Sequence, residues 1–160
     1  MSGPGDGAGP GHAAASLRDC VGRPVMSRAT AENLGRVSHV VIDVGNGTAR
    51  ALVVGSGKKA QVVDWTALSG FGPDAVMVGD EASLRSPAGE LEEAVAAGRR
   101  DLVGARALST EGVALGAVTD GDLDPETGRL LQVRVGDMVF DAGSLVGMGS
   151  YAVVLAVVST

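Results

Sequence analysis

Leu34-Gly35-Arg36-Val37 opens a stretch of sequence that runs to Val54 and returns, 81 positions later, as the stretch from Leu115 to Val135. The matching landmarks are Leu34/Leu115, Gly35/Gly116, Val37/Val118, Asp43/Asp124, Leu52/Val133 and Val54/Val135. After Val135 the second copy lacks four residues, and the match resumes 77 positions apart, at Leu68/Leu145, Gly72/Gly149, Ala75/Ala152 and Val76/Val153. Two copies of one small unit therefore account for most of the chain.

The composition favours β structure with an aliphatic core. Of the 160 residues, 45% are hydrophobic but only 2% are aromatic, so Val, Leu, Ile, Ala and Met must fill the interior. The 25 glycines suit many tight turns better than they suit long helices. We therefore expect two small, mainly β domains, at residues 17–84 and 101–160, with the second one shortened.

Short apolar segments separated by turn residues predict the strands. In the first unit they cover residues 23–27, 34–44, 49–54, 60–65 and 75–79, and in the second unit residues 105–109, 115–124, 130–135, 138–141 and 152–157. Asn46-Gly47 is the strongest hairpin signal. Val37 and Ile42 stay apolar in both copies although they have opposite parity along the strand, which predicts a β-bulge near Ser38-His39 that brings both into the core.

The remaining segments differ from the repeats. Residues 1–16 are rich in Gly, Pro and Ala without periodicity, which predicts a disordered tail. Residues 85–100 predict a linker helix, with Ser86 as its cap, Pro87 at its first position and an apolar stripe. The stripe is formed by Leu91, Ala94, Val95 and Gly98.

The landmarks and their spacing resemble the PRC-barrel family, named for the cytoplasmic domain of the photosynthetic reaction-centre H subunit. The same fold forms the C-terminal domain of a bacterial ribosome maturation factor. The resemblance implies two small six-stranded β-barrels that serve as adaptor or assembly modules, with no catalytic residues to carry over. It rests on Val21–Val25, Leu34–Val37, Val40–Asp43, Arg50–Val54, Val62–Leu68 and Gly72–Val78 in the first copy, and on Leu115–Val118, Asp124–Arg129 and Phe140–Leu145 in the second.

The best metal candidate is the acidic run of Asp120, Asp122 and Asp124. Clustered carboxylates suit hard cations, but Pro125 occupies the position where a calcium loop needs glycine, and Leu131 the position of its bidentate Glu. We expect a solvated hairpin here, with weak cation binding as the alternative, and assign no metal ligand.

No other motif predicts catalysis or a cofactor. Residues 147–152 resemble a dinucleotide fingerprint and residues 55–59 a phosphate loop, but both lack required positions and are expected to be turns. Cys20 has no histidine motif beside it and is expected to be an inert, small apolar residue. His39 is expected to be structural. The sequence therefore predicts a protein that is not an enzyme and that carries no catalytic or cofactor-binding residues.

Trp65 allows two interpretations. In the structural one, it plugs the end of the first barrel beside Leu68 and Phe71, where one indole adds substantial buried area to an aromatic-poor core. In the functional one, it anchors a partner, because Trp is enriched at binding hot spots. We favour the structural interpretation.

Charge and hydropathy exclude several classes of function. A net charge of −6 and an isoelectric point near 4.8 disfavour direct binding to DNA or RNA. No segment has the apolar length of a membrane span, and one cysteine gives no sign of an oxidising compartment. We expect a cytoplasmic, non-catalytic adaptor that binds a protein partner or itself. The alternatives are a ribosome- or RNA-processing accessory factor and a small-ligand or metal-sensing module.

Overall fold

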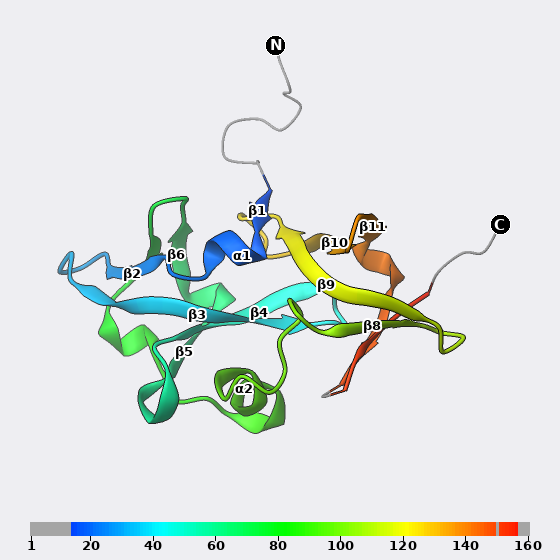
Figure 1. The fold of residues 1–160 in the computed structure, drawn as a ribbon. Helices are drawn as coiled ribbons and strands as arrows, with labels where there is room; N and C mark the ends of the chain where they lie inside the picture. The colour runs from blue at the N-terminus through cyan, green and yellow to red at the C-terminus, as the bar shows by residue number, and fades with distance from the viewer. Residues whose placement is uncertain (1–13, 150, 157–160) are drawn as a thin grey trace, which may run out of the picture.

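The computed structural model describes residues 14–149 and 151–156, and it is mainly β, as the sequence predicts (Figure 1). The first unit contains β2 (Pro24–Ser27), β3 (Asn33–Asp43), β4 (Thr48–Val54), β5 (Gln61–Asp64), β6 (Leu68–Phe71) and β7 (Val76–Val78). The second contains β8 (Arg106–Ser109), β9 (Ala114–Leu123), β10 (Leu130–Val135), β11 (Met138–Asp141), β12 (Leu145–Met148) and β13 (Val153–Leu155).

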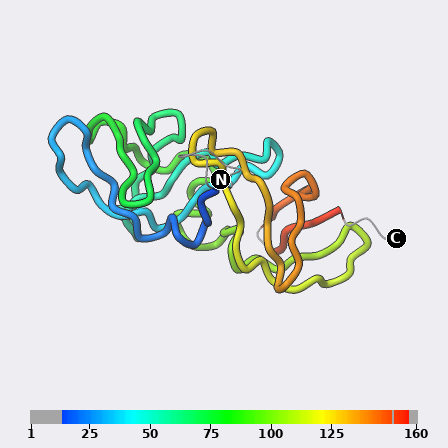
Figure 2. Tube along the Cα trace, turned by 90° about the horizontal axis from the view of Figure 1, so that it is seen from above, coloured from blue at the N-terminus to red at the C-terminus, as the bar shows by residue number. Residues whose placement is uncertain are grey.

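The two units have the same sheet topology. The first sheet has the order β5-β4-β3-β2-β7-β6, and the second has the equivalent order β11-β10-β9-β8-β13-β12. In the first sheet, β5 and β6 follow each other in the chain but lie at opposite ends of this order, and the 3-10 turn η2 (Trp65–Ala67) joins them. In the second sheet, η4 (Ala142–Ser144) joins β11 and β12 in the same way. The trace shows the units as two lobes, with the first described residues between them (Figure 2).

The predicted bulge at Ser38 is confirmed. Val37 pairs with Val54 and His39 with Val53, so Ser38 is the extra residue. The second unit repeats the irregularity at Thr119, because Val118 pairs with Val135 and Asp120 with Arg134. Each bulged hydroxyl donates to the carbonyl across the ladder, Ser38 to Val53 and Thr119 to Arg134, both at 3.3 Å. The bulge turns Val37 and Ile42 into the same core and curves the strand.

Several predicted boundaries are wrong. The expected tail does not extend to residue 16, because Ala15–Ser16 forms β1 and pairs with β9. The rest of this prediction, at residues 1–13, lies outside the described residues. The prediction also missed β6 and β12, which are short and interrupted by glycine. The four residues absent from the second copy come from the turn between the third and fourth strands, so β11 is as long as β5. The second unit is therefore complete in strands.

The linker helix is shorter than the expected 85–100. It is α2, Gly89–Ala96, and its cap position is Ala88 rather than Ser86. The first turn is closed by Glu92, whose carboxylate accepts the Ala88 backbone N–H at 2.9 Å. Glu92 is 1% exposed, although it does not belong to the predicted apolar stripe. In Figure 1 the helix lies below β3 and β4, and Val95 packs there with Val41, Val53 and Val62.

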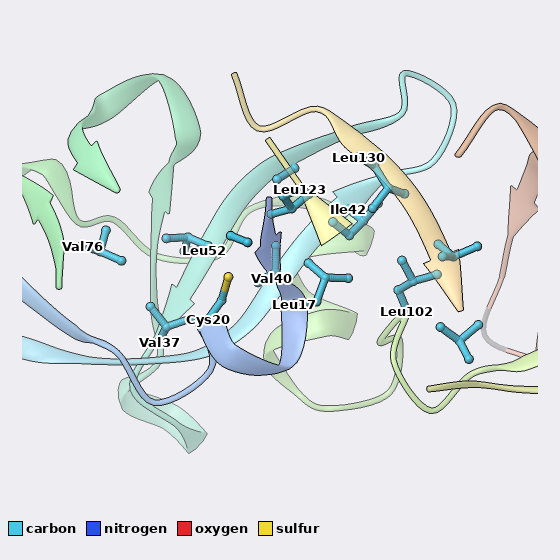
Figure 3. Packing of buried hydrophobic residues seen from close by; sticks show 14 of the residues in the cluster. Leu17, Cys20, Val37, Val40, Ile42, Leu52, Val76, Leu102, Leu123 and Leu130 are labelled. Carbon is cyan, nitrogen blue, oxygen red and sulfur yellow. The ribbon is translucent and has the colours of Figure 1, made fainter. Parts of the chain in front are cut away.

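One hydrophobic core spans both units. It includes Leu52 and Val76 from the first unit, Val133 and Leu155 from the second, and the short helix α1 (Leu17–Cys20) between them. In the close-up, Leu17, Ile42, Leu123 and Leu130 gather at the centre, where the two long hairpins meet (Figure 3). The two units therefore do not have separate interiors.

Candidate interaction site at the junction and on the second unit

Equivalent turns of the two repeats pair with each other at the junction. Thr48 and Arg129 form an antiparallel bridge, and these residues are 81 positions apart, at the same place in each repeat. The Ala49 N–H donates to the Gly128 carbonyl at 2.7 Å, and the Leu130 N–H donates to the Gly47 carbonyl at 2.8 Å. Ala49 is equivalent to Leu130 and Gly47 to Gly128, so these are the same hydrogen bond made once from each repeat. The units are thus joined as an isologous pair about a local two-fold axis.

Trp65 packs beside one of these paired turns. Its ring packs on Phe71, with centroids 4.9 Å apart, as the structural interpretation predicts. It also covers Gly128 of the other repeat so closely that a Cβ there would lie 2.7 Å from the indole. The indole therefore contacts both units, a role that the sequence did not reveal.

The second repeat has no counterpart of this indole. Ala142 stands at the position of Trp65, and a Cβ on Gly47, the counterpart of Gly128, would meet nothing within 4 Å. A hollow of about 660 Å³ opens there, lined by Gly47, Arg129, Ala142 and neighbouring residues. The two-fold relation is therefore broken at this end of the junction.

The lead-in segments of the units cross over at the junction. Ser16 Oγ and the Arg18 N–H both donate to Asp120 on β9 of the second unit. Reciprocally, His39 on β3 contacts Asp101, which leads into the second unit, with Nδ1 and Oδ1 3.0 Å apart. The hydrogen bond to Asp101 raises the pKa of His39 above its ordinary value, against the opposing effect of partial burial. Asp101 thus holds the His39 ring at the junction between the two units.

The outer faces of the two sheets are covered differently. In the first unit α2 packs over Val41, Val53 and Val62, which are 0% exposed. The equivalent residues of the second unit are Asp122, Arg134 and Val139. Asp122 accepts from Gln132 at 2.6 Å and from Arg134 at 2.9 Å, so this face has its own polar network. Val139 is 56% exposed.

The acidic run does not converge on one point. Asp120 is held by Ser16 and Arg18, Asp122 by Gln132 and Arg134, and Asp124 accepts the Glu126 N–H within its turn. Among residues 14–149 and 151–156, no three His, Cys, Asp or Glu side chains lie together as metal ligands. The run supports the hairpin and the junction.

The other candidates have structural surroundings. Cys20 is fully buried in the core, as expected for a small apolar residue, and burial raises the pKa of its thiol to about 11. Residues 55–59 form a turn that ends in the 3-10 turn η1 (Gly57–Lys59). Gly147 and Met148 belong to β12, while Ser150 of the glycine-rich segment lies outside the described residues.

A partly buried ion-pair network, missed from the sequence, joins α2 to the first sheet. The Arg85 guanidinium binds Asp64 at 2.6 and 3.2 Å and Glu92 at 2.7 and 2.8 Å. Arg85 lowers the pKa of Glu92, and both carboxylates raise the pKa of Arg85. The only sequence signal was an acid beside the apolar stripe of the helix.

The comparisons agree with this architecture. Within the described part of the chain, no helix combines the length and apolar character needed to cross a membrane. No curated protein matches the chain. The family model of the PRC-barrel domain matches residues 14–82, which run from just before β1 to the end of the first sheet, and the second unit repeats the strand order of that segment. The first unit, over residues 14–82, is therefore similar to the PRC-barrel domain.

Proposed function

We propose that this protein is a non-catalytic adaptor or assembly protein, and that it binds a protein partner, or a second copy of itself, through the outer surface of its second unit. The observation that carries the proposal is the uneven exposure of large apolar side chains. Among the described residues, those exposed are Val21 in the first unit and Val113, Leu131, Met138, Val139, Val146 and Tyr151 in the second.

Equivalent positions make the contrast plain. Val62 on β5 is 0% exposed beneath α2, whereas Val139 on β11 is 56% exposed. Large apolar side chains that stay exposed beside polar groups are typical of protein contacts. Asp122 and Arg134 supply such a polar border beside Val139.

The groups that could perform chemistry have structural partners, which supports a role in binding. His39 contacts Asp101, Glu92 is paired with Arg85, and the pKa of Cys20 is raised to about 11, so its reactive thiolate is scarce at neutral pH. We place this binding role in the cytoplasm, in keeping with the single, free, buried cysteine.

Two aspartate substitutions test the proposal. Tagged wild-type protein is used to capture partners from native cells, and light scattering measures self-association. Replacing Met138 and Val139 with Asp puts charge on the exposed part of β11 and is expected to abolish whichever association the wild type shows. Val21→Asp is the matched control, because Val21 is 50% exposed but lies on the first unit. A wild type with neither a partner nor self-association would overturn the proposal, as would equal effects of both changes.

A further inference from the structure

The edge of the first sheet is covered by a short extended segment of the same chain. The Val62 N–H donates to the Arg85 carbonyl at 2.7 Å, and the Arg85 N–H donates to the Val62 carbonyl at 2.9 Å. The side chain of Arg85 then reaches Asp64, two residues along β5. Both the backbone edge of β5 and its carboxylate are therefore satisfied by residues around Arg85.

The second sheet presents the same edge without this cover. Val139 pairs with Arg134 in the register in which Val62 pairs with Val53, so its N–H and C=O also point away from the sheet. Among the residues that the structure describes, none bonds to these two groups. Asp141 stands where Asp64 does, is exposed, and forms no ion pair or hydrogen bond with a described side chain.

We propose that the outer edge of β11 binds an extended, arginine-bearing segment of a partner protein as an added β-strand, with the arginine paired to Asp141. The inference rests on the proposed function and names the mode of contact. Strand addition draws its affinity from main-chain hydrogen bonds and its specificity from alternate side chains. Here the backbone groups of Val139 supply the main-chain hydrogen bonds, and the Asp141 carboxylate supplies the specificity for arginine.

The chain itself shows the chemistry of the occupant. On β5 the bound segment is extended, donates and accepts one backbone hydrogen bond at Val62, and pairs its guanidinium with Asp64. On β11 the flanking side chains, Met138 and Val139, are 45% and 56% exposed and offer apolar contact to such a segment. The second unit has no counterpart of Glu92 among the described residues, so Asp141 alone would hold the arginine.

An exposed strand edge must also be protected from non-specific pairing with the strands of other proteins. Native sheets protect their edges with short strands and charges. β11 has four residues and ends in the exposed Asp141, so it discourages pairing with acidic strands. A basic segment is the occupant that this carboxylate favours.

The test uses the full chain and a synthetic peptide, Ala-Ser-Leu-Arg-Ser-Pro-Ala, which copies residues 82–88. Because the chain's own segment is tethered to β5, the added peptide will not displace it at ordinary concentrations. Nuclear magnetic resonance titration should show saturable shifts of the Val139 and Asp141 amides. A peptide N-methylated at its arginine cannot donate the backbone hydrogen bond and is expected to lose binding.

Charge variants test the arginine contact. Asp141→Asn is expected to weaken binding about fivefold to tenfold, because a charge-assisted pair is lost. A peptide with citrulline in place of arginine should bind the wild type equally weakly, and the two changes together should cost no more than either alone. Asp137→Asn removes the same charge from the turn before β11 and should leave the affinity unchanged.

Three outcomes would overturn the inference: no saturable shift at Val139 with millimolar peptide, binding that survives N-methylation, or equal effects of Asp137→Asn and Asp141→Asn. If the peptide fails while the Met138 and Val139 variant still loses association, only strand addition is wrong. If the peptide binds but the protein has no partner and does not self-associate, the adaptor function is wrong and the edge chemistry stands.

Discussion

One indole decides how the two turns at the junction differ. Gly47 and Gly128 occupy equivalent turn positions with φ of +66° and +77°, a conformation that favours glycine at both. Only Gly128 also has a neighbour above it, because Trp65 lies within 3 Å of where its Cβ would be. A substitution at Gly47 therefore reports only the cost of the left-handed backbone, whereas one at Gly128 also reports the cost of the clash with Trp65.

Alanine at each glycine should reveal this difference. We expect Gly47→Ala to lower the free energy of unfolding by about 1 kcal/mol, the cost of placing a side chain in a left-handed conformation. Gly128→Ala should cost about 2 kcal/mol more, because the indole must move. Urea unfolding followed by circular dichroism measures both. Equal losses would mean that Trp65 does not hold the second unit.

At this scale the sequence predicted local contacts better than distant ones. That Trp65 packs beside Phe71 could be predicted, because the two lie in one repeat and a core with few aromatics needs the indole. Its contact with Gly128 could not, because the amino-acid pattern of a repeat says nothing about how two copies face each other. The partners of Asp120 were hidden for the same reason, since Ser16 and Arg18 cross over from the other unit.

Among the elements, α2 depends on a buried charge more than on its apolar stripe. Glu92 closes the first turn through the Ala88 N–H and holds Arg85, which in turn covers the edge of β5. One carboxylate therefore connects the helix, the extended segment and the sheet. Such a group is costly to remove because its partner is left without its full set of hydrogen bonds.

Glu92→Gln should lower the free energy of unfolding by about 2 kcal/mol at neutral pH, because one charge-assisted network is lost. Since Arg85 lowers the pKa of Glu92 in the folded state, its contribution is complete above the ordinary value of 4.5 and disappears as the pH falls through the lowered value. Wild type and variant should therefore converge in acid. Glu93→Gln, on the exposed side of the helix, is the control and should change little at any pH. A loss that is independent of pH would contradict the charge argument.

The predicted elements were most accurate where hydrophobic alternation was strong. The long strands β3 and β9 and the bulge at Ser38 were found because the two copies could be compared position by position. The short strands β6 and β12 contain glycine and were missed, since glycine interrupts the alternation. The ends of α2 were misplaced because Glu92, rather than Ser86, satisfies the first turn.

For the whole molecule, the repeat predicted two units but did not predict that they share one hydrophobic core. The sequence favours two barrels joined by a helix, whereas the structure gives them a common core and paired turns, with α1 packed between them. This difference follows from the local two-fold axis, because apolar residues of the two long hairpins meet there and need no further cover.

A common core predicts that the two units unfold together. Leu155→Ala empties part of the second unit, far along the chain from Trp65, and should cost about 2 to 5 kcal/mol because Leu155 is 0% exposed. The fluorescence of Trp65, the only tryptophan, reports on the first unit, yet its unfolding midpoint should fall as much as the circular dichroism midpoint. Leu52→Ala, which is equally buried in the first unit, calibrates the shift. If Leu155→Ala leaves the Trp65 transition in place, the units fold independently and the junction is only a surface contact.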